Sequence, residues 1–150
     1  MSISQYARST CQQSPMRLRK DNDNMKFMLM TKLANESAPP PTPELMAAIG
    51  KFTAEMLKTG KVVSTGGLMP TSRGAKMRLS GGKITITDGP FAEAKECIGG
   101  YAVVQVNSKE EAIEMAREFL QIHADVMGPG YELDSEIRQM YEPGAAPGGN

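Results

Sequence analysis

Short apolar runs with two different periods divide the chain into strands and helices. Residues 26–32 form a short apolar run bounded by polar residues, which predicts a central strand. A helix is predicted to begin at Thr42-Pro43-Glu44, where the threonine can cap free amide groups, and to end at Gly60. Its apolar residues recur at helical spacing on one face, namely Leu45, Ile49, Phe52 and Met56.

Two alternating segments in the middle of the chain predict a hairpin. Residues 76–80 and 83–87 flank Gly81-Gly82, and a glycine pair at that spacing favours a two-residue turn. The alternation also fixes a register, because one face must hold the apolar side chains. That register places Ser80 opposite Lys83, Leu79 opposite Ile84, and Met77 opposite Ile86.

A second helix is predicted after a capping box. Ser108 and Glu111 stand at the spacing at which each side chain can bind a backbone amide near the start of the helix. The apolar stripe that follows consists of Ala112, Met115, Ala116, Phe119 and Leu120. Three further strands are predicted at residues 61–65, 100–106 and 133–137, the last after the break at Gly128-Pro129-Gly130.

The resulting order is β-α-β-(hairpin)-β-α-β, which predicts an α+β domain of the ferredoxin-like split βαβ type. Both helices can cover the same face of one antiparallel sheet through right-handed crossovers. The other face of the sheet would then be bare. If that face is apolar, we expect a second copy of the chain to cover it, so the protein is predicted to be a homodimer.

The ends of the chain lack the pattern of a folded domain. Residues 1–24 are rich in polar side chains and predict a disordered extension, while the Pro/Gly/Ala-rich residues 143–150 predict a flexible tail. The domain is therefore expected at residues 25–142. Cys11 and Cys97 are expected to be free thiols in a reducing cytoplasm, and no apolar run is long enough to cross a membrane.

Charge and composition exclude several classes of partner. The 17 basic residues equal the 17 acidic residues, so nothing favours nucleic acid or an anionic membrane. One histidine and two distant cysteines make a poor ligand set, so neither haem, a metal nor another cofactor is predicted. Twelve methionines fit an irregular core, or alternatively a methionine-lined apolar pocket.

The most distinctive stretch is Asp88-Gly-Pro-Phe-Ala-Glu-Ala-Lys-Glu96, with Gly99-Gly100 close behind it. Asp88 ends a predicted strand, and the glycine and proline that follow favour a tight turn. The stretch resembles the DGPF signature of the YCII-related family, as do Gly66-Gly-Leu68 upstream and Glu136-Ile-Arg138 downstream. Ala94 departs from the usual threonine of this signature, and Gln139 departs from a common proline.

This resemblance implies a dimeric α+β barrel, in which two ferredoxin-like sheets pack face to face. Proteins with that barrel include muconolactone isomerase-like enzymes, haem-degrading monooxygenases and ligand-binding modules. The DGPF branch has mostly no assigned reaction, and its members often accompany extracytoplasmic-function sigma factors. The resemblance therefore implies a small-molecule cleft but names no substrate.

A site follows from the same resemblance, because a His/Asp pair has been proposed as the active site of YCII-like proteins. Asp88 would be the base or orienting carboxylate, and His123 the proton carrier. The residues expected to bind a substrate are Arg138, Lys95, Glu93 and Glu96.

Each of these residues also has a structural alternative. Asp88 can accept hydrogen bonds from its own turn, and His123 near a helix end can be solvated or can complement the helix dipole. Arg138 can pair with Glu136, and the motif's charged residues can form a surface cluster. Whether the protein is an enzyme stays open at this stage. The sequence supports a dimeric small-molecule-binding protein with lyase- or isomerase-like acid/base chemistry, or a non-enzymatic regulatory module linked to sigma-factor-dependent transcription.

Overall fold

The computed structural model describes residues 25–34, 39–91 and 97–143. The predicted extension at residues 1–24 and all but the first residue of the predicted tail lie outside this part of the chain. The elements are β1 (Met25–Leu33), α1 (Pro43–Lys58), β2 (Val62–Gly67), β3 (Ala75–Ser80), β4 (Lys83–Asp88), β5 (Cys97–Val106), α2 (Lys109–Met127) and β6 (Asp134–Gln139). A 3-10 turn, Thr71–Arg73, precedes β3. Every strand and helix predicted above is present.

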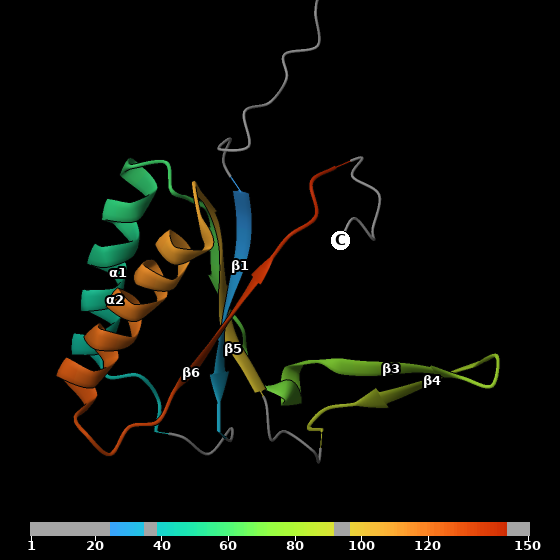
Figure 1. The fold of residues 1–150 in the computed structure, drawn as a ribbon. Coiled ribbons are helices and arrows are strands. Elements are labelled where there is room, and N and C mark those ends of the chain that lie inside the picture. The colour runs from blue at the N-terminus through green and yellow to red at the C-terminus, as the bar shows by residue number, and fades with distance from the viewer. Residues whose placement is uncertain (1–24, 35–38, 92–96, 144–150) are drawn as a thin grey trace, which may run out of the picture.

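Four strands form an antiparallel sheet in the order β2-β5-β1-β6. Both helices lie on one side of this sheet (Figure 1). The fold is therefore a mixed α+β fold, compatible with a ferredoxin-like arrangement, as the element order predicts.

Both helices begin at the predicted caps. The Leu45 amide donates to Thr42 Oγ1 at 3.2 Å at the start of α1. At the start of α2, the Glu111 amide donates to Ser108 Oγ at 3.2 Å. The Glu111 carboxylate in turn accepts, at 3.0 Å, from the backbone amide of Asn107, which is the residue before the cap. These bonds supply partners for amides that the helix geometry leaves without one.

The core lies between the helices and the near face of the sheet. Phe27 and Val104 face each other across β1 and β5, and both are almost fully buried. The other residues of this core cluster are Val62, Val106, Ala112 and Met115. The apolar stripe predicted for α2 is thus confirmed, but the helix runs beyond it to Met127.

The hairpin forms a sheet of its own. Strands β3 and β4 pair in the predicted register, with Leu79 opposite Ile84 and Met77 opposite Ile86. They do not join the larger sheet, and we call this two-stranded unit, residues 75–88, the arm. Figure 1 shows that the arm projects from the side of the sheet opposite the helices. The sequence pattern predicts the pairing within the hairpin but does not show which sheet the hairpin joins.

Candidate functional site

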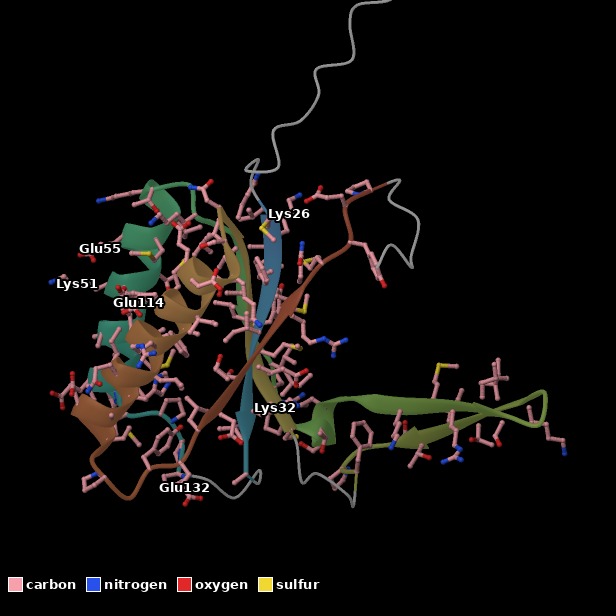
Figure 2. The ribbon with its side chains drawn as sticks, in the orientation of Figure 1. Lys26, Lys32, Lys51, Glu55, Glu114 and Glu132 are labelled. Carbon is pink, nitrogen blue, oxygen red and sulfur yellow. The ribbon has the colours of Figure 1, made fainter. Side chains whose placement is uncertain are left out.

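The far side of the four-stranded sheet carries no helix among the described residues, and we call it the open face. Side chains alternate along a strand, so the even-numbered residues of β1 and their cross-strand partners point to this side. Met28 lies between Val103 and Arg138, and Met30 lies between Tyr101 and Glu136. The same register adds Lys26, Gln105, Lys32, Ile98 and Asp134. In Figure 2, Lys26 and Lys32 mark the two ends of β1, with Lys32 at the end where the arm begins.

The centre of the open face is apolar. Met28, Met30, Tyr101 and Val103 lie side by side on the two central strands, and all four are half-buried. The Tyr101 ring lies over Gly66 of β2, where an added Cβ would come within 3.2 Å of the ring. A larger residue at this position would push the ring away from the sheet. Met28 and Met30 thus line a surface rather than the core.

Charged side chains flank this apolar strip on the side of β6. Glu136 forms ion pairs with Lys32 and with Arg138, the latter at 3.2 Å. The hydrogen bond from Lys32, followed by that from Arg138, lowers the pKa of Glu136 below its ordinary value of 4.5. The carboxylate is therefore ionised at neutral pH. The alternative in which Arg138 pairs with Glu136 is confirmed, but the arginine side chain is 72% exposed and keeps donors for a second acceptor.

Asp88 lies at the base of the arm. It is the last residue of β4, pairs with Ala75, and is exposed. In the turn that follows, the Gly89 amide donates to the Gly74 carbonyl at 2.9 Å, and the Phe91 amide donates to Thr71 Oγ1 at 3.3 Å. These two amides have acceptors other than Asp88. Asp88 is thus an exposed residue at the base of the arm, which lies on the open side of the sheet (Figure 1).

His123 lies in a different environment. Only 7% of it is exposed, and it continues the buried stripe of α2. Its ring lies 4.6 Å from that of Phe119 and 6.0 Å from that of Tyr131, onto which it stacks. Its Nδ1 is 2.9 Å from the Phe119 carbonyl oxygen, one helical turn earlier. The alternative of a solvated histidine is wrong, because the helix extends past residue 123 and buries the ring.

The predicted site residues therefore do not gather in one place within the chain. Asp88 and Arg138 belong to the open side of the sheet, whereas His123 belongs to the helix layer on the other side (Figure 1). Glu93, Lys95 and Glu96 lie outside the described residues, as does Ala94. Lys32 and Glu136 were not among the predicted binding residues. The alternation of β1 places Lys32 on the same face as the two methionines, which is the signal that could have found it.

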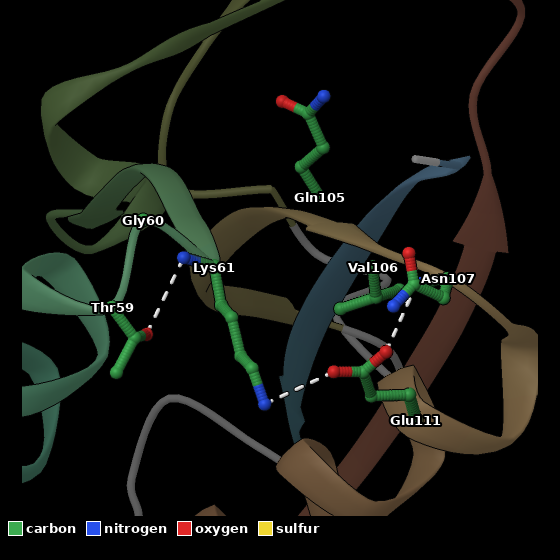
Figure 3. Close-up of a pocket in the computed structure, with 7 residues that line it drawn as sticks. All are labelled: Thr59, Gly60, Lys61, Gln105, Val106, Asn107 and Glu111. Atoms are coloured by element: carbon green, nitrogen blue, oxygen red, sulfur yellow. Dashed lines mark hydrogen bonds and ion pairs between the residues drawn. The ribbon is translucent and has the colours of Figure 1, made fainter. Parts of the chain in front are cut away.

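A separate polar hollow of about 240 Å³ lies where β2 and β5 meet the start of α2 (Figure 3). Its charged groups already bind each other, because Lys61 Nζ lies 3.0 Å from Glu111 Oε1. The other carboxylate oxygen of Glu111 accepts from the Asn107 amide. This arrangement holds the start of α2 to the end of the sheet, and we assign it a structural role.

Replacing Glu111 by glutamine is expected to destabilise the protein at neutral pH by about 1 kcal/mol. The Asn107 amide, and then Lys61, lower the pKa of Glu111 below 4.5. The stabilisation is therefore fully present above pH 4.5 and is lost as the pH falls through the lowered value. Urea unfolding at pH 7 and at pH 3 measures the difference between the two proteins, which should be smaller at pH 3.

Glu114→Gln is the control for that change. Glu114 pairs with Arg117 on the same helix at 3.2 Å, but both side chains are 60% exposed or more. Exposed pairs of this kind contribute little, so this variant should match the wild type within about 0.5 kcal/mol. Equal losses for the two variants at pH 7 would show that the charge of Glu111 contributes no more than the charge of an exposed pair.

Two kinds of feature are absent from the part of the chain that the structure describes. Within residues 25–34, 39–91 and 97–143, no three residues among His, Cys, Asp and Glu come together as a metal site would require. Neither α1 nor α2 combines the length and the hydropathy of a membrane-spanning helix.

Comparisons with known proteins match most of the chain. Residues 25–127 match the model of the YCII-related domain, a span that runs from the start of β1 to the end of α2 and includes the arm. An uncharacterized protein of Rhizobium meliloti (strain 1021) is 30% identical over 103 residues, which cover 69% of this chain and 80% of that protein. Because the family match spans well over half of the sequence, the chain belongs to the YCII-related family.

Proposed function

We propose that the protein is a DGPF-type homodimer that binds a small acidic molecule at the open face, close to the base of the arm. The observation that carries the proposal is the composition of this face. An apolar strip of Met28, Met30, Tyr101 and Val103 adjoins the charged cluster of Lys32, Glu136 and Arg138. Small-molecule sites commonly combine an apolar lining with a few convergent polar groups.

The dimer is supported by the one-sided covering of the sheet. A sheet normally buries an apolar face against a second layer, and here the helices cover only one of the two faces. A two-fold axis between two such faces would bury both apolar strips at once. This arrangement agrees with the dimeric barrel that the DGPF resemblance implies.

The charges of the open face support an acidic ligand. Three basic residues, Lys26, Lys32 and Arg138, stand against Asp134 and Glu136, which leaves one positive charge. Arg138 has the greatest exposure of the ion-paired groups in this cluster, and its planar fork suits a carboxylate.

Asp88, on the same side of the sheet, is the group we propose for proton transfer to or from the ligand, in lyase- or isomerase-like chemistry. The pairing of Asp88 with His123 stays a prediction, and the packing of His123 favours a structural role for that residue.

Arg138→Gln tests the ligand site, with phenylacetate as the probe and neutral phenylacetamide as its isostere. We expect a saturating concentration of phenylacetate to stabilise the wild type by about 2 kcal/mol, and phenylacetamide to have little effect. Arg138→Gln should abolish the response, because the charged fork is lost. Thermal unfolding monitored by circular dichroism measures the shift.

Arg117→Gln is the matched control, since Arg117 is also an exposed arginine paired with a glutamate of its own element. It should keep the full response. Asp88→Asn should bind the probe and unfold near the wild-type midpoint, but should lose any turnover of a substrate. If neither compound shifts the midpoint and the protein instead retains a sigma factor in a pull-down, the regulatory-module alternative replaces this proposal.

A further inference from the structure

The arm carries an apolar surface that nothing in the described chain covers. Four side chains are largely exposed: Met77 at 63%, Leu79 at 73%, Ile84 at 64% and Ile86 at 65%. The pairs Met77–Ile86 and Leu79–Ile84 lie on the same face of the hairpin, because side chains two residues apart point the same way. The other face carries Lys76, Arg78, Thr85 and Thr87. Such alternation is typical of a sheet with one buried face.

A two-stranded hairpin with this pattern is not expected to stand alone in water. Isolated hairpins are marginally stable, and they gain stability when an apolar face packs against another layer. A contiguous exposed apolar patch on a small protein commonly marks an interface. The apolar face of the arm is therefore expected to pack against a partner.

The base of the arm is held firmly. The Gly74 amide donates to the Thr71 carbonyl at 2.9 Å, and the Gly89 amide donates to the Gly74 carbonyl at 2.9 Å. Gly89 itself packs directly on Thr71, whose carbonyl oxygen lies 1.6 Å from where a Cβ would be. These contacts fix the position at which the arm leaves the sheet. The apolar face is thus presented in a defined direction.

We propose that the partner is a second copy of this chain, and that the arm packs into the groove between α2 and β6 of that copy. This α2–β6 groove has a volume of about 370 Å³. Its lining is mostly apolar, with three polar residues among eight: Ile113, Ala116, Leu120, Ala124 and Ile137, and Arg117, Gln121 and Ser135. The inference rests on the face-to-face dimer proposed above.

The length of the arm supports its placement in the α2–β6 groove of the second copy. Six-residue strands extend about 20 Å, because each residue adds roughly 3.3 Å. Two sheets that pack face to face lie about 10 Å apart, and a helix layer lies roughly another 10 Å beyond. The arm leaves its own sheet on the open side (Figure 1), so it extends past the partner's sheet to the level of the partner's helices. The arm follows β2 in the chain, and β2 and β6 are the two edges of the sheet. A two-fold axis parallel to the strands therefore places the arm of one copy opposite the β6 edge of the other copy.

Charge supports it as well. The arm carries three basic residues, Lys76, Arg78 and Lys83, against Asp88, which leaves two positive charges. Helix α2 carries five acidic residues against Lys109 and Arg117, which leaves three negative charges. The basic side chains lie on the polar face of the arm and do not enter the groove, so the opposite net charges attract the two surfaces at long range without forming ion pairs in the groove.

The test is the dissociation constant of the full-length dimer, measured by sedimentation velocity. The double variant Leu79→Ser/Ile84→Ser removes two apolar side chains per arm, and a dimer has two arms. We expect the dissociation constant to rise at least about 100-fold. Both residues are exposed in the single chain, so the fold should be kept, which circular dichroism verifies. Thr85→Ser/Thr87→Ser alters the polar face of the same arm and should leave the constant unchanged.

A second variant tests whether the α2–β6 groove is the site at which the arm binds. Ala124→Arg places a bulky positive charge in the α2–β6 groove and should weaken the dimer to a similar extent. Combined with the arm variant, it should add little, because both changes break the same contact. Ala54→Arg, on an exposed position of α1, is its control and should have no effect.

The outcomes separate this inference from the dimer itself. If the arm variant dimerises like the wild type while a charge on the open face abolishes dimerisation, the arm contact is overturned and the face-to-face dimer stands. A wild type that is monomeric at micromolar concentration overturns the dimer proposal and this inference with it. An unchanged dimer whose basic arm binds a DNA duplex, with binding lost in the arm variant, would assign the arm to nucleic acid instead.

Discussion

Replacing Met30 by aspartate is expected to convert dimers of the protein into monomers. Met30 lies at the centre of the open face, opposite Tyr101 of β5 and Glu136 of β6. In the proposed face-to-face dimer, the variant would bury one carboxylate from each copy next to a second acid, Glu136. Burying unpaired charges costs several kcal/mol, so the dissociation constant should rise by more than about 1000-fold. Light scattering after size-exclusion chromatography reads out the mass.

Met30→Leu is the control for that variant, because it conserves the apolar character and nearly the volume of the side chain. It should elute and scatter as the wild type does. The aspartate lies on a half-buried position in the single chain, so we expect the monomer to stay folded. A dimer that survives Met30→Asp with wild-type affinity would mean that the open face is not the interface.

Replacing Gly89 by alanine is expected to be the most damaging small change at the base of the arm. The new Cβ would stand 1.6 Å from the Thr71 carbonyl oxygen and 2.5 Å from its carbon, both backbone atoms. The turn at Thr71–Arg73 or the start of the 89–91 segment must then move. Since Gly89 and Gly74 also share a backbone hydrogen bond, we expect a loss of about 3 kcal/mol in the free energy of unfolding.

Urea unfolding measures this loss, and Gly50→Ala provides the contrasting case. Gly50 lies in the interior of α1, on its exposed side, with nothing within 4 Å of an added Cβ. Alanine favours a helix over glycine, so this variant should gain about 1 kcal/mol. Opposite signs for the same chemical change would show that the space around the glycine determines the result. Equal effects would contradict the crowding at Thr71.

Local patterns predicted the elements of this fold closely. The caps at Thr42 and Ser108 and the register of Leu79 with Ile84 follow from short stretches of sequence, and all are present. The pattern could not place the arm, because alternation within a hairpin does not reveal which sheet it joins. The burial of His123 was not predicted either. The periodicity of Met115, Phe119 and His123, each four residues apart, contains that information, but a histidine is easily counted as the end of an apolar stripe.

The candidate site was predictable only in part. Arg138 and its pairing with Glu136 follow from two residues on the same face of one strand. Asp88 and His123 are 35 positions apart in sequence, and only the three-dimensional fold shows that their elements occupy opposite sides of a sheet. The ion pair of Lys32 with Glu136 depends on the register between β1 and β6, which no single segment encodes.

The exposed apolar face of the arm has a consequence for the newly made chain. While its apolar face is uncovered, the arm has two unpaired strand edges and an exposed apolar surface. Segments of this kind promote aggregation between identical chains. Lys76, Arg78 and Lys83 alternate with the apolar residues along the same two strands. Repeated positive charges at such positions act as gatekeepers, because stacking identical strands would bring like charges together. The charges of the hairpin thus oppose its aggregation during biosynthesis, before a second copy is available to cover the apolar face.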